Sequence, residues 1–215
     1  MSLRAKTKYV QPTKPAPNAG ITLYCSSDAV TCLWVRLVLA EKDVEGARFE
    51  LQKPGRISED LLLLNPSQTL PTLADRETVI YPARVIAEYL DERYPHPPMM
   101  PSEPSHRARL RMALDRLEQD YFTQLQLIET GTPAVARGAR KRLADMIASS
   151  SPLFPARGGW FLGLEHSIVD SAWTALFWRI AELKLDLPPA ADPVRRYAQR
   201  AFARTSFQRV VPARR

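Results

Sequence analysis

The sequence contains few cysteines and histidines and no long apolar run. Its 215 residues include two cysteines and three histidines, and no 18 consecutive residues are apolar, which argues against a membrane-spanning helix. Residues 1–20 are polar and proline-rich and lack the apolar segment of an export signal, so we expect a flexible basic tail there. We therefore predict a cytoplasmic protein in which Cys25 and Cys32 stay reduced. The histidines show no spacing typical of a metal site, and we predict no cofactor.

Acidic residues are missing from both ends of the chain, although the net charge is +7. Residues 1–20 hold four basic residues and residues 193–215 hold seven arginines, with no acid in either segment. The rest of the chain has 19 basic and 23 acidic residues, a net charge of −4. A DNA-binding groove in the body is therefore not expected. Solvated tails are the favoured interpretation, and an approach to an acidic partner or nucleic acid through the basic ends stays open.

The first third of the chain alternates between strand and helix patterns. Apolar β-rich runs predict strands at 21–25, 48–52, 69–74 and 78–81, and helical patterns cover 30–44, 59–64 and 83–94. Capping residues precede two of these helices, in the Ser-Ser-Asp segment 26–28 and at Ser58. Pro82 suits the first turn of the third helix. The order βαβαββα in residues 21–94 predicts one α+β domain.

The back half of the chain shows only helix patterns. A proline-rich connector, residues 95–106, separates it from the first domain. Apolar residues at helical spacing predict helices at 106–131, 134–152, 167–184 and 192–204, and no strand among them. The aromatic residues Trp173, Phe177 and Trp178 are interpreted as core. Residues 107–215 are therefore predicted to form an all-α domain.

The connector begins with the segment PHPPMMP at 95–101, in which four of seven residues are proline. Proline removes backbone donors and excludes helix, so we expect a stiff, extended segment that displays His96, Met99 and Met100. Such a segment can serve as a spacer, a proton-transfer site or a surface that another protein recognises. Catalysis by His96 would need an orienting partner such as Asp91 or Glu92, and is the least favoured use. From the residues alone, spacer and recognition surface are equally supported.

Two motifs resemble the glutathione transferase fold, a thioredoxin-like domain followed by an all-α domain. TLPTLAD at 69–75 places Pro71 where that fold has a cis proline, and Ser167 with Asp170 forms the capping-box spacing ahead of an apolar helix. The resemblance covers residues 21 to about 210. It implies a two-fold homodimer, because proteins of this fold commonly pair the first domain of one subunit with the helical domain of the other.

The residues that bind glutathione in that fold are replaced here. Ala-Val-Thr at 29–31 stands where a thiol-activating residue is expected, and Pro82 and Ala83 replace an acidic residue and a serine that hold the ligand's carboxylate. Neither can make those hydrogen bonds, and each lost charged bond costs about 1.5 to 3 kcal/mol. Leu70, before Pro71, can still offer its backbone. Leu70, Pro71, Pro82 and Ala83 therefore outline a damaged, residual glutathione-like pocket.

One branch of the fold resembles this chain more closely. DLLLLNPSQTLPTLADRE at 60–77 and EYLDERYPHPPMMP at 88–101 are similar to the stringent starvation protein A family, a bacterial group that associates with RNA polymerase and is not known for transferase activity. The resemblance implies a non-catalytic transcription regulator that docks on RNA polymerase or its sigma factor through Tyr94, Pro95, His96, Pro97 and Pro98. Glu103 departs from relatives with an aromatic residue there. The alternative is a glutathione transferase with a weak, altered site, and direct nucleic-acid binding is not expected.

Overall fold

The first domain has the element order that the sequence predicts. The computed structural model describes residues 20–53, 57–155 and 157–211, so nearly all of the predicted tail at 1–20 lies outside the described residues. The elements are β1 Thr22–Cys25, α1 Val30–Glu41, β2 Arg48–Leu51, α2 Glu59–Leu64, β3 Thr72–Asp75, β4 Thr78–Ile80 and α3 Ala83–Arg93. This βαβαββα unit confirms the thioredoxin-like domain.

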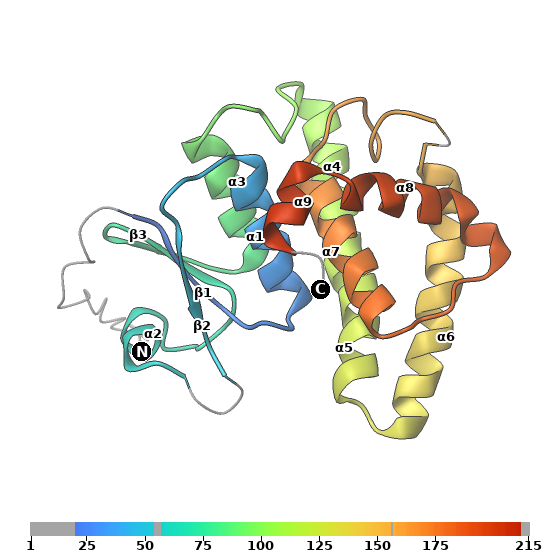
Figure 1. Cartoon of the computed structure of the whole chain (residues 1–215), viewed down its shortest axis with the longest axis horizontal. Helices are drawn as coiled ribbons and strands as arrows, with labels where there is room; N and C mark the ends of the chain where they lie inside the picture. The colour runs from blue at the N-terminus through green and yellow to red at the C-terminus, as the bar shows by residue number, and fades with distance from the viewer. Residues whose placement is uncertain (1–19, 54–56, 156, 212–215) are drawn as a thin grey trace, which may run out of the picture.

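The four strands form one mixed sheet in the order β2-β1-β3-β4. The β1 strand runs parallel to β2 and antiparallel to β3, and β4 is antiparallel to β3. All four residues of β1 are buried, whereas the edge strand β2 is exposed along its length. Helix α1 packs against α3, α7 and α9 (Figure 1). Those contacts confirm that α1, which is apolar nearly all round, is covered on more than one side.

The second domain is helical. Helix α4 Pro104–Arg116 continues through a π-helical turn, η1 Leu117–Phe122, into α5 Thr123–Thr130, so the single helix predicted at 106–131 has a widened middle. The other elements are α6 Pro133–Ser150, α7 Ile168–Glu182, α8 Asp192–Phe202 and α9 Thr205–Val210, with short 3-10 turns η2 Ser151–Leu153 and η3 Pro189–Ala191. None of the described helices is both long and apolar enough to cross a membrane.

The caps agree with the sequence patterns at two helices and differ at two others. Ser58 accepts a hydrogen bond at the start of α2, and Ser167 and Asp170 form the predicted capping box of α7. Helix α1 starts at Ala29 with no side-chain cap, because the predicted capping segment 26–28 bonds within itself. Pro82 is the N-cap of α3 rather than a residue of its first turn.

One apolar core runs through both domains. The fully buried Trp34 of α1 donates its indole N–H to the carbonyl of Ile168 at the start of α7, at 3.1 Å. Trp173 and Phe177 are buried, and Trp178 is half-buried against Phe202 and Phe207, which confirms the predicted aromatic core. The domains are thus held together by packing as well as by the connector.

Candidate functional site

The connector after α3 presents its prolines and its histidine to solvent. Residues 95–98 are all exposed, and Tyr94, the C-cap of α3, is half-buried with the guanidinium of Arg93 over its ring. The peptide bond between His96 and Pro97 is cis. In Figure 1 the connector lies at the upper edge of the molecule, where it passes from α3 to α4. Four of the five residues predicted for docking therefore lie fully on the surface.

Met99 and Met100, which we expected to be displayed beside His96, are buried. Their exposed fractions are 3% and 6%, and both belong to the apolar core shared by the two domains. The prediction was wrong because the connector crosses the junction of the domains, where two apolar side chains gain more from burial than from exposure. The displayed surface is thus limited to residues 94–98.

The buried ion pair of Lys42 and Asp91 holds the backbone of the connector. The side chain of Lys42, at the end of α1, has no exposed surface. Its Nζ donates to Oδ1 of Asp91 and to the carbonyl oxygen of Pro97, each at 2.5 Å. The same Asp91 oxygen accepts the N–H of Met99 at 2.7 Å. The backbone is therefore held on both sides of Pro98, and a buried ammonium is tolerated only because it has these partners.

The connector is also held beyond the methionines. The carbonyl of Met99 accepts the N–H of Ile168, the first residue of α7, at 3.1 Å. The guanidinium of Arg107 donates to the carbonyl of Pro101 at 2.9 Å. These two bonds hold residues 99–101 to the start of α7 and to α4.

Glu103 ends the connector as a helix cap. Its carboxylate accepts the backbone N–H groups of Ser105 and His106, at 3.0 and 2.6 Å. The hydrogen bond from the Ser105 hydroxyl, followed by these amides, lowers the pKa of Glu103 to about 2. Helix α4 begins at Pro104, inside the range 95–106 assigned to the connector, because proline suits the first turn of a helix. Glu103 thus has a structural use here.

His96 lacks the surroundings of a general base. No hydrogen-bond partner of its ring lies among the described residues. The Oδ1 oxygen of Asp91, the acid considered as its orienting partner, is already bound by Lys42 and Met99. Orientation by a second group is what a catalytic imidazole needs, whereas a recognition residue needs only exposure.

The four residues of the predicted glutathione-like pocket meet at one end of the β3–β4 hairpin. The pairing of Leu73 with Ile80 brings the chain at Pro71 opposite the chain at Pro82. The Leu70–Pro71 bond is cis, as the resemblance implied. Pro82 makes no side-chain cap bond, and Ala83 is 2% exposed. The two positions expected to bind a carboxylate therefore offer no side-chain hydrogen bond.

A cleft of about 360 Å³ lies between the start of α1 and the end of α7. It is lined by Ser27, Asp28, Ala29, Val30, Leu33, Arg36, Trp178, Arg179, Glu182, Val210 and Val211. None of the four predicted pocket residues lines it. Residues 29–31 offer no thiol-activating hydroxyl or thiol other than Thr31, which is half-buried inside the first turn of α1.

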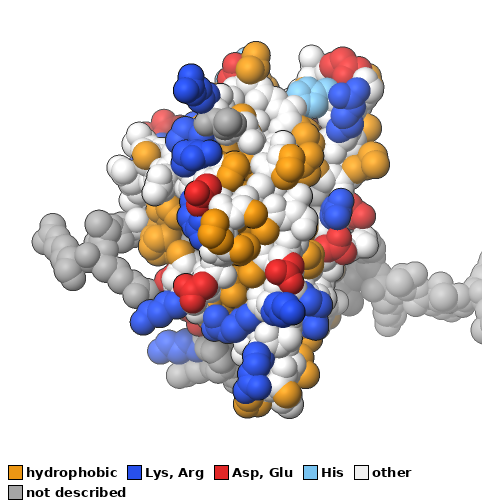
Figure 2. Space-filling view, turned by 90° about the vertical axis from the view of Figure 1, so that its right-hand side faces the viewer, with side chains coloured by type: hydrophobic (Ala, Val, Ile, Leu, Met, Phe, Trp, Pro, Cys, Tyr) orange, Lys and Arg blue, Asp and Glu red, His pale blue; other side chains and the backbone are white. Residues whose placement is uncertain are grey.

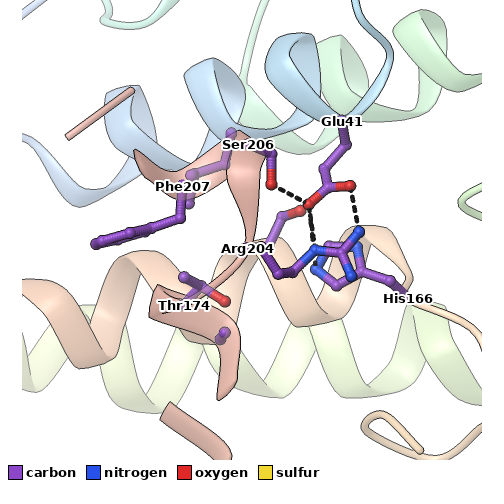
Figure 3. A pocket seen from close by; sticks show the side chains of 9 residues that line it. Glu41, His166, Thr174, Arg204, Ser206 and Phe207 are labelled. Atoms are coloured by element: carbon purple, nitrogen blue, oxygen red, sulfur yellow. Dashed lines mark hydrogen bonds and ion pairs between the residues drawn. The ribbon is translucent and has the colours of Figure 1, made fainter. Parts of the chain in front are cut away.

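A polar cluster between the domains was missed by sequence reasoning (Figure 3). Glu41, the last residue of α1, accepts two hydrogen bonds from Arg204, both 2.6 Å, and one from the Ser206 hydroxyl at 2.5 Å. His166 Nε2 lies 3.8 Å from the same carboxylate, and its Nδ1 has no partner among the described residues. Burial raises the pKa of Glu41, but the hydrogen bonds from Arg204 and Ser206 and the charges of His166 and Arg204 together outweigh it and leave the pKa lowered. Burial lowers the pKa of His166.

The arginines of residues 193–211 do not form a solvated tail, which corrects the interpretation from charge. Arg204 pairs with Glu41, and Arg209 of α9 pairs with Asp43 at 2.6 Å. Both acids lie in the first domain, far away in sequence, so their pairing was not visible in the composition. Figure 2 shows the face of the helical domain around α6, where basic and acidic side chains lie interspersed with hydrophobic ones. No continuous basic groove is present on that face.

Comparison of structures places the chain in the glutathione transferase fold. The theta class glutathione S-transferase of the citrus canker pathogen Xanthomonas axonopodis pv. citri, solved with glutathione bound, superposes with a TM-score of 0.79. The match covers 90% of this chain and 98% of that one at 18% sequence identity, so it shows the fold alone. The family model of the glutathione S-transferase N-terminal domain matches residues 23–98.

Two curated relatives cover most of the chain at higher identity. The stringent starvation protein A homologue of Pasteurella multocida is 42% identical over 188 residues, which are 87% of this chain and 88% of the relative. The homologue of Coxiella burnetii is 38% identical over 191 residues, 87% of this chain and 90% of that protein. Both matches extend over 87% of the chain, so they are not confined to one of the two domains. The chain therefore belongs to the stringent starvation protein A family.

Proposed function

We propose that the chain is a non-catalytic transcription regulator that binds bacterial RNA polymerase or its sigma factor during starvation or stress. Its contact surface is Tyr94 with residues 95–98. The family name supports a role in starvation, and the contact surface is supported by the geometry of the connector.

The observation that carries the proposal is that the exposed residues 95–98 of the connector are also firmly anchored. Lys42 binds the carbonyl of Pro97 and Asp91 binds the N–H of Met99, so the backbone is held on either side of Pro98, while residues 95–98 are exposed to solvent. Ordering a flexible loop costs about 0.5 to 1.5 kcal/mol for each immobilised side chain. Prolines held in place lose little on binding, so a small surface of this kind supports specific association.

The absence of catalysis is supported by the two candidate sites. Pro82 and Ala83 cannot form side-chain hydrogen bonds to a glutathione carboxylate, and His96 has no orienting partner among the described residues. Carboxylate binding is lost at Pro82 and Ala83, whereas His96 lacks an orienting partner among the described residues. Restoring the carboxylate ligands would therefore not make His96 a general base.

The test replaces Pro95, His96 and Pro97 together with alanine. The variant should stay folded, because residues 95–97 are exposed and their side chains lie outside the apolar core, and a melting curve checks this before binding is measured. Its retention on immobilised RNA polymerase holoenzyme should fall at least tenfold, and its effect on transcription from a purified template should fall in parallel. A folded triple variant that binds polymerase as wild type does would reduce the connector to a spacer.

A matched control changes exposed turn residues elsewhere in the first domain. Pro66 and Ser67 follow α2, which lies at the lower left of the molecule, whereas the connector lies at its upper edge (Figure 1). The double replacement by alanine also removes a proline and a polar side chain from the surface. It should leave polymerase binding unchanged, and an equal loss in both variants would point to general destabilisation.

A glutathione transferase with an altered site is the second candidate. The fold favours it, since the theta class glutathione S-transferase solved with glutathione bound superposes over 90% of this chain. Retention on immobilised glutathione and turnover of a general electrophilic substrate separate the candidates. Turnover at ordinary transferase rates would overturn the non-catalytic proposal.

We also infer a homodimer. Helices α3 and α4 lie side by side, joined by the ion pair of Arg111 with Glu88 at 2.5 Å. The same helices expose Val85 and Met112, which are 48% and 72% accessible. Apolar side chains this exposed on adjacent helices of the two domains fit a two-fold contact between the first domain of one subunit and the helical domain of the other.

A further inference from the structure

The fold brings together the chain's two cysteines, which are seven residues apart in the sequence. Cys25 ends β1 and Cys32 lies in the first turn of α1, and the two side chains are near enough for each to shift the pKa of the other. The backbone N–H of Ser26 donates to Cys32 Sγ at 3.2 Å. Because that nitrogen is bonded to the carbonyl carbon of Cys25, the Cys32 sulfur lies against the backbone of Cys25. Both cysteines are free thiols.

The two sulfurs differ in acidity. The Cys32 thiol lowers the pKa of Cys25 more than burial raises it, and nearby Arg36 also lowers it. The Cys25 thiol raises the pKa of Cys32, and burial raises it further. Cys25 is thus favoured as the thiolate and Cys32 as the thiol that stabilises it. This asymmetry is the arrangement of an attacking and a resolving cysteine.

A path to the pair runs through the segment that joins the two cysteines. Both side chains are 0% exposed, so a reagent reaches them only if this segment opens. Ser27 and Asp28 are exposed and line the 360 Å³ cleft together with Ala29 and Arg36. Helix α1 has no side-chain cap to hold its first turn. A small molecule in the cleft is therefore separated from the sulfurs by one short segment, residues 26–29.

We propose that Cys25 and Cys32 form an oxidant-sensitive thiol pair, which a small hydroperoxide closes into a reversible intramolecular disulfide. The site lies apart from the connector surface, and the proposal does not depend on polymerase binding.

The chemistry balances with a hydroperoxide as the oxidant. The Cys25 thiolate attacks one peroxide oxygen, the O–O bond breaks, and the departing oxygen takes up a proton and leaves as water from hydrogen peroxide or as an alcohol from an organic hydroperoxide. The Cys32 sulfur then attacks the sulfenic acid of Cys25, the S–O bond breaks, and the hydroxide leaves as water with the Cys32 proton. The two thiols lose two electrons in total and the hydroperoxide gains them. A dithiol reductant reverses the step by exchange.

The experiment treats the full, folded chain with hydrogen peroxide, stops the reaction with catalase, and then denatures and alkylates the protein with a maleimide. Intact mass should fall by two hydrogens, the oxidised fraction should take up no maleimide, and a digest should contain a linked peptide pair with Cys25 and Cys32. Dithiothreitol should restore two alkylated thiols. Since the site is enclosed, cumene hydroperoxide at equal concentration should react at least tenfold more slowly.

Two variants assign the roles. Cys32→Ser should trap sulfenic acid at Cys25, detected as a dimedone adduct, and Cys25→Ser should leave Cys32 fully alkylatable. The wild-type measurement decides the proposal even if a variant fails to fold. Folded wild type that keeps both thiols alkylatable after peroxide would overturn it. A disulfide between two chains, or sulfinic acid without an internal disulfide, would also overturn it.

Discussion

Removing the buried ammonium of Lys42 tests whether the connector is anchored as described. In Lys42→Ala, Asp91 remains 10% exposed with only the N–H of Met99 as a partner, and the carbonyl of Pro97 loses its donor. Breaking a buried pair by removing one member costs about 3 to 5 kcal/mol, since an uncompensated charge is left in the core. Unfolding by urea should therefore show a loss of this size. For a chain of this length, the melting temperature should fall by roughly 10 °C.

Lys42→Ala should increase the local motion of residues 94–98 under conditions in which the protein is still folded. The amide of Met99 should exchange its hydrogen faster in Lys42→Ala, and polymerase binding should weaken at a temperature where the variant is still folded. The double variant Lys42→Met with Asp91→Leu should recover part of the lost stability, because apolar replacement of a buried pair is often neutral. A loss below about 1 kcal/mol in Lys42→Ala would show that the pair is solvated, and the anchoring argument would fail.

Three further outcomes are expected. Pro82→Glu with Ala83→Ser should raise retention on immobilised glutathione more than it raises turnover, because it restores carboxylate ligands and no thiol-activating group; equal gains would contradict this. Met112→Glu should convert a dimer into a species of half its mass by light scattering, and an unchanged mass would place the interface elsewhere. The folded-state pKa values of His166 and Glu41 are both lowered, so their stabilising contributions are present at high pH and are lost on acidification. His166→Phe should flatten the decline below about pH 6.5 and Glu41→Gln the decline below about pH 4.5, measured by urea unfolding across pH, and unaltered slopes would refute the assignment.

Local patterns were sufficient to predict the elements and their order. Strands and helices are set by the spacing of apolar residues, and the capping box at Ser167 and Asp170 is contained in four consecutive residues. The cap of α1 was mispredicted because the Ser-Ser-Asp segment at 26–28 forms its own turn bonds, which compete with capping. The sequence offers no means to choose between two such local uses of the same side chains.

Contacts between distant segments were the part that could not be predicted. Lys42 was one charged residue at a helix end, and only the fold shows that it lies beneath Pro97. Arg204 was counted as part of a basic end, yet it pairs with Glu41, 163 residues earlier. Composition reports how many charges a segment holds, and burial of an ion pair depends on which segments meet. The non-helical backbone of residues 95–98 was predictable, because it follows from the local run of prolines and not from contacts with distant segments.

The end of α1 explains why the connector surface and the C-terminal helices belong to one structural unit. Glu41 binds Arg204, Lys42 binds Asp91 and the connector carbonyl, and Asp43 binds Arg209. These three consecutive residues bind three different segments, because α1 ends at Glu41 and the side chains that follow point in different directions. A shift of α1 would therefore displace the Lys42 contact with the connector and the Asp43 contact with α9 together. Since Cys32 lies in the first turn of α1, the proposed oxidation at that turn and the proposed recognition near the last turn would act on the same helix.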